Sequence, residues 1–184
     1  MTQDDTKVSK FLSLVLRHEP DRIGLALDHE GWADVDLLIE RASQHGMPLT
    51  RELVRRVVET SGKQRFALDG TARRIRANQG HSIDVDLGLD PREPPAVLFD
   101  GTGSAAVAAI RAGGLQPGSR RHVHLSPDEV TAIKVGRRHG RPVVLRVQSG
   151  RMWMAGSRFF CSVNGVWLTS AVAPGFIEFP HELS

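Results

Sequence analysis

The sequence predicts an α+β protein built from two parts. Three observations support this prediction: helical spacing of apolar residues followed by a hairpin signal, an acidic segment with prolines, and then many short strands with two helices. A chain of 184 residues is long enough for one ordinary domain or two small ones. We therefore expect a first domain over residues 1–82, a linker over 83–95 and a second domain over 96–184.

The first domain begins with three predicted helices. Apolar residues three and four positions apart predict the first helix, which Asp5 or Thr6 would cap and Pro20 would end. A second helix closes at Gly46, and a third begins at Thr50. The apolar face of the first helix consists of Val8, Phe11, Leu12 and Val15.

Short strands complete the first domain. Residues 23–28 are apolar at alternate positions and are predicted as a strand, and two further strands flank the Asp69-Gly70 turn. Three helices followed by a two-stranded wing are typical of winged-helix domains, which commonly bind nucleic acid. The predicted third helix and wing, residues 51–76, hold eight basic residues against three acidic ones.

The second domain alternates strands with two helices. The second of these helices would begin with a Ser126 cap followed by Pro127 and would run to about His139. Strands on either side of an Asn164-Gly165 turn are expected to pair. The predicted strands cover residues 96–100, 122–126, 142–147, 158–163 and 166–172, and the first helix covers 104–111.

The basic residues are distributed unevenly along the chain. The formal net charge is +3, yet residues 81–100 carry a net −4 and residues 101–184 a net +6. Twenty of the 24 basic residues are Arg, whose guanidinium binds phosphate through two parallel hydrogen bonds. Codon bias would also explain the Arg excess. Phosphate-bearing partners are consistent with this pattern.

Cysteine content and hydropathy exclude several classes of protein. Cys161 is the only cysteine, so an intrachain disulfide and a Cys-rich zinc site are both impossible. No stretch has the length and apolar character of a signal peptide or a membrane span. We expect a soluble, cytoplasmic, monomeric protein without a membrane partner.

Three basic residues of the first domain are candidate phosphate ligands. Arg17 and His18 lie at the end of the first helix, where the helix dipole favours a protonated imidazole. Alternatively, these basic residues could serve only to stabilise the negative end of the helix dipole, without binding a ligand. Arg65 opens the first wing strand and could equally be an exposed strand charge.

A second group of candidates lies at residues 120–126. His122 and His124 alternate along a predicted strand and therefore share a face, which Arg120 joins. A zinc site would need a third ligand, and no suitable His or Cys lies nearby. We therefore expect no metal.

Two other segments are candidate binding sites. Residues 101–106 fit the dinucleotide fingerprint G-x-G-x-x-A between a strand and a helix. The rest of the chain is too short for a doubly wound sheet, although backbone N–H groups there could bind a pyrophosphate. A second segment contains polar residues that could bind hydroxyls or phosphates near the domain junction, or that could simply form an ordinary turn. They are Asn78, Gln79 and His81.

Eight ordered motifs identify a family resemblance. They are SKFLSLVLRH, GWADVDLL, KQRF, IRANQGHS, F-x-G-T, GL, R-x-HVHLS and SVNGVWLT. With these motifs, the chain from Ser9 to Pro174 resembles the NAD-dependent RNA (tRNA) 2′-phosphotransferase family, also called KptA. The resemblance implies an N-terminal winged-helix lobe that binds RNA and a C-terminal ADP-ribosyltransferase-like lobe that binds NAD+.

The resemblance also implies a reaction in two steps. An internal RNA 2′-phosphate attacks the nicotinamide riboside carbon of NAD+ and expels nicotinamide. The O2″ hydroxyl then attacks the phosphate, which gives RNA with a 2′-OH and ADP-ribose 1″,2″-cyclic phosphate. Such chemistry belongs to tRNA splicing or RNA repair. NAD+ would be consumed as a co-substrate, and no metal would be needed.

Site residues follow from matching the motifs. The resemblance implies a catalytic tetrad of Arg17, His18, Arg65 and Arg120, in which the arginines clamp phosphate and His18 clamps it too and exchanges a proton. It implies NAD+ binding by Asp100, Gly101, Thr102, His122, His124 and Ser126. It implies RNA or phosphate binding by Asn78, Gln79 and His81.

Position 100 departs from the family pattern. The pattern usually has His-Gly-Thr, whereas this chain has Asp100-Gly101-Thr102. An ionised Asp cannot donate a hydrogen bond and would repel a pyrophosphate, but it could accept hydrogen bonds from ribose hydroxyls. Two alternatives to the enzyme remain open: a winged-helix nucleic-acid-binding protein with a nucleotide-binding lobe, and an ADP-ribosyltransferase acting on other phosphorylated ends or on protein.

Overall fold

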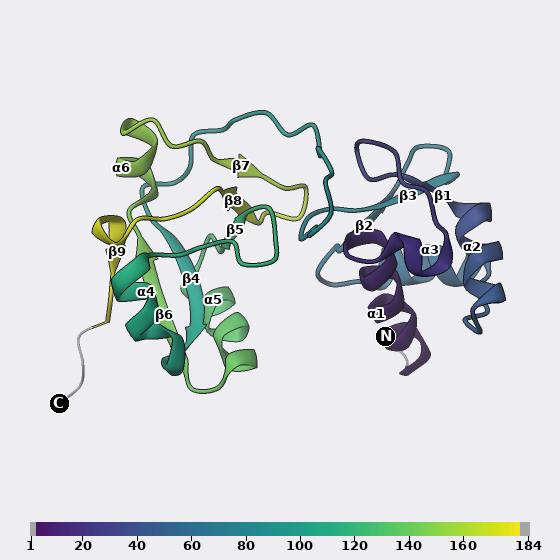
Figure 1. The fold of residues 1–184 in the computed structure, drawn as a ribbon, viewed down its shortest axis with the longest axis horizontal. Helices are drawn as coiled ribbons and strands as arrows, with labels where there is room; N and C mark the ends of the chain where they lie inside the picture. The colour runs from purple at the N-terminus through teal and green to yellow at the C-terminus, as the bar shows by residue number, and fades with distance from the viewer. Residues whose placement is uncertain (1–2, 181–184) are drawn as a thin grey trace. The chain divides into compact units, whose positions relative to one another are not determined.

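The computed structural model describes residues 3–180, and its contacts divide the chain into two compact units (Figure 1). Unit 1 is Met1–Gly88 and unit 2 is Leu89–Ser184, so the division falls inside the segment predicted as a linker. Each unit has its own hydrophobic core. Both mix helices with small antiparallel sheets, which confirms the α+β class.

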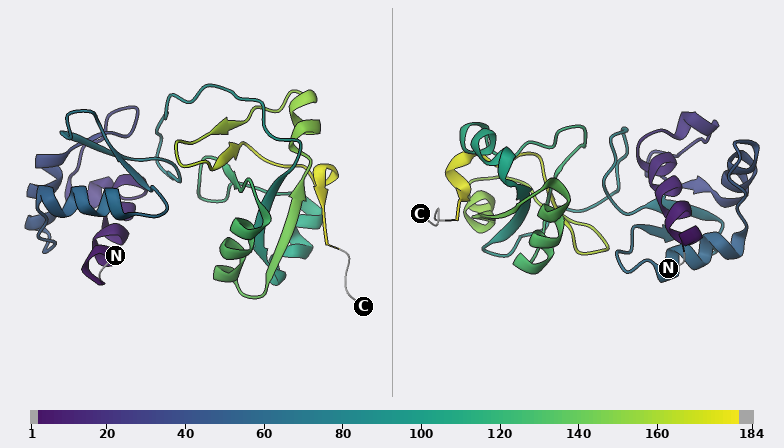
Figure 2. Two further views of the ribbon diagram at one scale, coloured as in Figure 1. Left: turned by 180° about the vertical axis from the view of Figure 1, so that it is seen from behind. Right: turned by 90° about the horizontal axis from the view of Figure 1, so that it is seen from below.

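Unit 1 contains three helices and a three-stranded sheet. Its sheet has the order β1-β3-β2 and is antiparallel throughout. Helix α1 packs against α3 and strand β3, while α2 packs against α3 (Figure 2). The elements are α1 Gln3–Arg17, the 3-10 turn η1 Pro20–Ile23, β1 Ala33–Asp34, α2 Val35–Gln44, α3 Arg51–Thr60, β2 Phe66–Leu68 and β3 Arg74–Ala77.

Local sequence signals explain most of these boundaries. The Thr50 hydroxyl accepts the Leu53 N–H at 3.1 Å, which caps α3 as predicted. The hairpin around Asp69-Gly70 is also confirmed, because β2 pairs with β3. The winged-helix identity of unit 1 stays a prediction.

Two predictions for unit 1 are wrong. Asp5 lies inside α1 rather than at its cap; it is 3% exposed and accepts two hydrogen bonds from Arg56 of α3, at 3.0 and 3.2 Å. Residues 23–28 form no strand. Instead η1 ends at Ile23, the following Gly24 turns the chain with a φ of 62°, and Leu25 is buried without a strand partner. Alternate burial alone produced the strand-like pattern.

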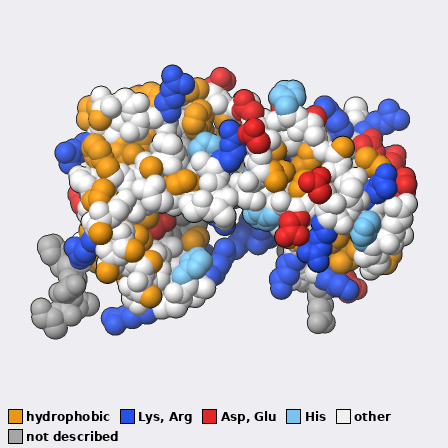
Figure 3. Space-filling model, viewed as in Figure 1, with side chains coloured by type: hydrophobic (Ala, Val, Ile, Leu, Met, Phe, Trp, Pro, Cys, Tyr) orange, Lys and Arg blue, Asp and Glu red, His pale blue; other side chains and the backbone are white. Residues whose placement is uncertain are grey.

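The basic excess of α3 and the wing is partly neutralised. Arg51, Arg55 and Arg56 pair with Asp36, Glu59 and Asp5, respectively. On the face shown in Figure 3, basic side chains of this unit are interspersed with acidic ones. Unit 1 therefore does not present α3 as a uniformly positive helix.

Unit 2 is built on two small antiparallel sheets. Their orders are β4-β6-β9 and β5-β8-β7. Helix α5 packs along β4 and β6, and α4 lies on the other face of that sheet (Figure 1). The elements are β4 Leu98–Gly103, η2 Ser104–Ala106, α4 Val107–Gly113, β5 Val123–Leu125, α5 Glu129–Gly136, η3 Arg137–His139, β6 Pro142–Val147, α6 Ser149–Met154, β7 Phe160–Cys161, β8 Trp167–Thr169, η4 Pro174–Phe176 and β9 Ile177–Glu178.

The structure corrects the predicted start and end of α5. Asp128, not Ser126, is the N-cap, because its carboxylate accepts the Thr131 N–H at 2.8 Å. The helix ends at Gly136 and continues to His139 only as a 3-10 turn. The strands on either side of Asn164-Gly165 pair as expected, while α6 was not predicted.

Two glycines of β4 allow α5 to pack closely. A Cβ on Gly101 would lie 1.7 Å from the Ala132 carbonyl oxygen, and one on Gly103 would lie 2.1 Å from that of His139. Side chains alternate along a strand, so Gly101 faces α5 and Gly103 faces η3, while Asp100 and Thr102 face the opposite way. The G-x-G spacing of this segment therefore serves helix-strand packing.

Candidate functional site

Unit 1 brings the first group of candidates together at the end of α1. The Arg65 carbonyl accepts two hydrogen bonds, from the Asn78 N–H at 2.9 Å and from Arg17 Nη2 at 3.3 Å. The Asn78 side-chain amide donates to the Gln64 carbonyl at 2.6 Å. We call Arg17, His18, Arg65, Asn78 and Ser82 the polar cluster of unit 1.

His18 is oriented by Ser82. His18 Nδ1 lies 2.9 Å from the Ser82 hydroxyl oxygen, and the Ser82 N–H donates to the Arg17 carbonyl at 2.9 Å. The Ser82 hydroxyl itself donates to the same carbonyl at 3.5 Å, which leaves its oxygen to accept from Nδ1–H. In the tautomer of neutral His18 that carries its proton on Nδ1, the ring donates this hydrogen bond to Ser82.

Backbone strain marks the segment before Arg65. Gln64 has a φ of 41°, in the left-handed region that a residue with a side chain adopts only at a cost. The Asn78 amide holds the Gln64 carbonyl, and Asn78 is itself 5% exposed. A buried side chain thus fixes the conformation that presents Arg65.

Arg17 is packed as well as hydrogen bonded. Its guanidinium carbon lies 5.8 Å from the centroid of the Phe66 ring, and its Nη1 would lie 3.5 Å from a Cβ on Gly80. Gly80 has a φ of 91°, which favours glycine, so the chain passes close to the guanidinium without a side chain in the way. Arg17 is half-buried, a state that strengthens its electrostatic interactions.

The other predicted RNA-binding residues lie beside the cluster in sequence. His81 is 5% exposed and packs against Gly31, whose Cβ would lie 3.5 Å from His81 Nε2. Gln79 is half-buried. The burial of Asn78 and His81 indicates that both help to shape the local backbone.

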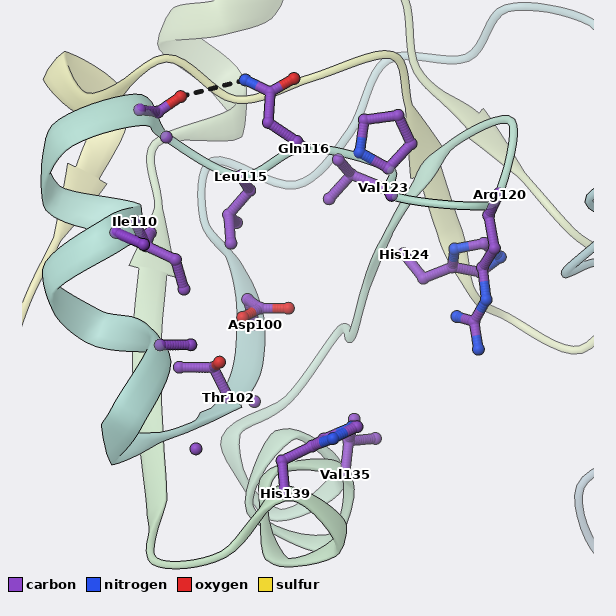
Figure 4. A pocket seen from close by; sticks show the side chains of 18 of the residues that line it. Asp100, Thr102, Ile110, Leu115, Gln116, Arg120, Val123, His124, Val135 and His139 are labelled. Atoms are coloured by element: carbon purple, nitrogen blue, oxygen red, sulfur yellow. Dashed lines mark hydrogen bonds between the residues drawn. The ribbon is translucent and has the colours of Figure 1, made fainter.

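The second group of candidates surrounds a cavity of about 710 Å³ in unit 2 (Figure 4). Asp100 projects into it from β4, Ile110 from α4 and His124 from β5 (Figure 4). Arg120 lies on the exposed loop before β5, at the rim. Every predicted NAD+-binding residue except Ser126 lines this cavity: Asp100, Gly101, Thr102, His122 and His124. Ser126 instead pairs its backbone with Phe99 of β4.

Asp100 is the unusual member of this lining. Its carboxylate makes no hydrogen bond or ion pair with any residue of the described range 3–180. Burial raises the pKa of Asp100 to about 6. The cavity therefore contains an acceptor that the protein itself does not satisfy.

His122 is held neutral by its surroundings. Burial lowers the pKa of His122, and the nearby charge of Arg121 lowers it further. Its ring also meets the Phe160 ring edge-on, with centroids 5.9 Å apart. Neutral His122 can donate one hydrogen bond and accept another.

Sequence reasoning missed several residues of both sites. Ser82 and Gln64 act on His18 and Arg65 through folding contacts that no local pattern indicates. His139 and Gln116 line the cavity, yet both belong to segments predicted only as helix end and loop. Their roles depend on where α5 and the loop after α4 lie in the folded unit.

Within residues 3–180, no group of three or more His, Cys, Asp or Glu side chains is arranged to hold a metal ion. None of the helices in the same part of the chain is long and apolar enough to cross a bilayer.

Comparisons with known proteins agree with one another. A model of the "RNA 2'-phosphotransferase, Tpt1 / KptA family" matches residues 3–171. A protein of Hahella chejuensis named "Probable RNA 2'-phosphotransferase" is 54% identical over 170 residues, which cover 92% of this chain and 91% of that protein. Proteins of the same name from Agrobacterium fabrum (54% identical, 91% and 90% covered) and Streptomyces coelicolor (52% identical, 98% of both) are similarly close.

Proposed function

Since this chain belongs to the RNA 2'-phosphotransferase, Tpt1 / KptA family, we propose that it removes an internal 2′-phosphate from RNA by transferring it to NAD+. The observation that carries the proposal is the polar cluster of unit 1, where hydrogen bonds join Arg17, His18 and the backbone of Arg65 at one end of α1. Two arginines and a histidine suit a dianionic phosphate.

The proposed reaction has two steps. First, a 2′-phosphate oxygen bonds to the nicotinamide riboside carbon, and the bond from that carbon to nicotinamide breaks. Next, the O2″ hydroxyl bonds to phosphorus, and the bond from phosphorus to the RNA 2′-oxygen breaks. The products are nicotinamide, RNA with a 2′-OH and ADP-ribose 1″,2″-cyclic phosphate. The proton lost by O2″ is balanced by the one gained by the RNA 2′-oxygen.

The cluster's residues supply charge stabilisation and proton transfer. Arg17 and Arg65 donate to phosphate oxygens, whose negative charge spreads over the equatorial positions in the second step. We assign to His18 a proton exchange with O2″ or with the departing RNA oxygen, and its hydrogen bond with Ser82 orients the ring. Arg120 of unit 2 is the fourth residue to which the family resemblance assigns a phosphate-binding role.

The cavity of unit 2 fits a dinucleotide. Its volume of about 710 Å³ lies within the range of roughly 300–1,000 Å³ usual for small-molecule sites. Its lining combines apolar walls with His122, His124 and Asp100, which can meet the hydroxyl and amide groups of NAD+. NAD+ supplies the activated riboside carbon. Unit 1 would be the winged-helix RNA lobe, and unit 2 the ADP-ribosyltransferase-like lobe.

An oligonucleotide with one internal 2′-phosphate tests the proposal. The full chain is incubated with it, with and without NAD+, and the products are resolved by mass spectrometry. We expect loss of the 2′-phosphate and release of nicotinamide only when NAD+ is present. Phosphate loss without NAD+, or no reaction with it, would contradict the proposal. The reaction should also survive EDTA, and the active species should elute as a monomer.

Matched arginine variants separate catalysis from binding. Arg120→Ala should abolish turnover while the protein stays folded, whereas Arg121→Ala removes the same charge one residue away and should retain activity. If this protein only binds nucleic acid, both variants would weaken binding modestly and in a salt-dependent way. Accumulation of ADP-ribosylated RNA in the wild type would instead favour an ADP-ribosyltransferase.

A further inference from the structure

The sheet of unit 1 has one face in the core and one face turned away from it. Buried core residues form the first face: Ala33, Phe66, Ile75 and Ala77. Side chains alternate along a strand, so the residues next to these project from the opposite side. We call that side the outer face, and its residues, none of which is buried, are Trp32, Asp34, Arg65, Ala67, Arg74 and Arg76.

Arg76 lies in the middle of the outer face and has no carboxylate partner. It stands opposite Ala67 of β2, and its guanidinium carbon lies 4.5 Å from the centroid of the Trp32 ring. Nε of Arg76 is buried without a hydrogen-bond partner, and the side chain makes no hydrogen bond or ion pair with any residue in the described range 3–180. The contact with Trp32 therefore holds a guanidinium in place while its donors remain unused.

The other charges near Arg76 are already paired. Arg74 pairs with Asp28 at 3.5 Å and with Asp69 at 3.2 Å. The carboxylate of Asp34 accepts two backbone N–H groups at the start of α2. The arginines of α3 are paired with carboxylates as well. An anionic ligand of unit 1 is therefore favoured at Arg76 over α3.

Arg65 shares the outer face with Arg76. The Asn78 N–H donates to the Arg65 carbonyl at 2.9 Å, so Arg65 lies opposite Asn78 and diagonally across from Arg76. The Cα atoms of such diagonal neighbours in an antiparallel pair are about 7–8 Å apart, a gap that two arginine side chains can span. Under the proposed function Arg65 binds the 2′-phosphate. A neighbouring backbone phosphate of the same strand then lies within reach of Arg76.

We propose that the outer face binds the RNA strand that flanks the 2′-phosphate, and that Arg76 donates hydrogen bonds to a phosphate of its backbone. This inference rests on the proposed function. A guanidinium presents two parallel N–H groups to two phosphate oxygens, and one that is already held against an aromatic ring loses little freedom on binding. An acidic protein would meet the same charge, but RNA is favoured because Arg65, the proposed ligand of the 2′-phosphate, projects from the same face.

Binding of RNA to the full chain without NAD+, followed by fluorescence anisotropy, tests the proposal without turnover. The probe is a single-stranded oligonucleotide with one internal 2′-phosphate, and adenosine 2′-monophosphate, which has no flanking strand, is the competitor. Arg76→Gln keeps a polar side chain beside Trp32 and loses the charge, whereas Arg76→Lys keeps the charge and loses the planar fork. Arg55→Gln is the matched control, because Arg55 is an exposed arginine of α3, outside the sheet. Thermal unfolding checks that each variant is folded.

Arg76→Gln should bind the oligonucleotide roughly tenfold more weakly than wild type, the lower end of the value of a hydrogen bond to a charged group. The slope of log affinity against log salt concentration should be smaller by about 0.7, because one phosphate contact to a single strand is lost. Arg76→Lys should keep the wild-type slope, and Arg55→Gln should bind as wild type does. The affinity for adenosine 2′-monophosphate should be the same in every protein.

Three results would overturn the inference. An unchanged affinity and slope in Arg76→Gln would leave the outer face to another partner, such as an acidic protein. An equal loss of affinity for adenosine 2′-monophosphate would show that Arg76 only supports the polar cluster. A loss of the same size in Arg55→Gln would move the RNA to α3.

A parallel dephosphorylation assay with NAD+ separates the two proposals. NAD+-dependent loss of the 2′-phosphate, combined with wild-type binding by Arg76→Gln, defeats this inference alone. RNA binding that depends on Arg76, without NAD+-dependent loss of the 2′-phosphate, defeats the proposed function.

Discussion

Replacing Asp100 with Asn should stabilise the protein without nucleotide, by an amount that grows as the pH rises above about 4 and is complete above about 6. Burial raises the pKa of Asp100 from 3.8 to about 6, because the charged form is disfavoured in the cavity. The folded protein therefore holds this proton at pH values where the unfolded chain has released it. Folding stability falls as the pH rises from about 4 to about 6 and stays lowered above that.

The size of the effect follows from the pKa. Each pKa unit corresponds to about 1.36 kcal/mol, so full ionisation of Asp100 costs the folded state up to about 3 kcal/mol. Asp100 is half-buried, and solvent reduces this cost to roughly 1–3 kcal/mol. Asp100→Asn, which carries no charge, should be more stable than wild type by that amount at pH 7.5 and by little at pH 4.

Urea unfolding at several pH values measures this difference. Trp153 and Trp167 belong to unit 2, and their fluorescence reports its unfolding in both proteins. Asp90→Asn is the control for loss of one exposed carboxylate and should follow wild type at every pH. The reasoning fails if Asp100→Asn shows no advantage at pH 7.5, or if its advantage is the same at pH 4.

Three further predictions concern single side chains. Ser82→Ala should lower kcat/KM about tenfold and change its pH profile, because His18 loses the hydrogen-bond partner of Nδ1. Ser82→Thr, which keeps the hydroxyl, should restore both. An unaltered pH profile in Ser82→Ala would refute the orienting role of Ser82. Gly101→Ala should destabilise unit 2 by about 3 kcal/mol or more in urea, because its Cβ would clash with the Ala132 carbonyl. Asp69→Asn should lower the melting temperature at pH 7 but much less at pH 2. Burial raises the pKa of Asp69, yet hydrogen bonds from the turn outweigh it and lower the pKa to about 2, so this stability is lost as the pH falls from about 4 through 2. A temperature difference that persists at pH 2 would contradict this last prediction.

Short-range signals in the sequence predicted much of the fold. The Thr50 cap and the Asp69-Gly70 hairpin involve neighbouring residues only, so local chemistry determines them. The start of α5 was misplaced because Ser126 and Asp128 are both good caps, and only the helix geometry decides between them. The strand predicted over residues 23–28 was wrong because an irregular segment that lies on a hydrophobic core also shows alternate burial.

The candidate functional residues could be predicted from the sequence, but the residues that hold them in position could not. Arg17 and His18 occur in a recognisable motif, and their position at the end of α1 follows from helical periodicity. Ser82 reaches His18 across 64 residues, and Asn78 holds the strained Gln64 backbone through a tertiary hydrogen bond. No pattern in the sequence encodes such pairs, because each needs the wing to be folded beside α1.

The packing of β4 explains how position 100 can differ from its family. Gly101 faces α5 and Gly103 faces η3, where no larger residue fits, whereas Asp100 and Thr102 face the cavity. Substitutions on the cavity side leave the contact with the helix unchanged, so position 100 can vary without repacking of the core. The same alternation offers an engineer two adjustable positions on an otherwise fixed strand. Libraries at residues 100 and 102 should therefore yield folded proteins far more often than libraries at 101 and 103.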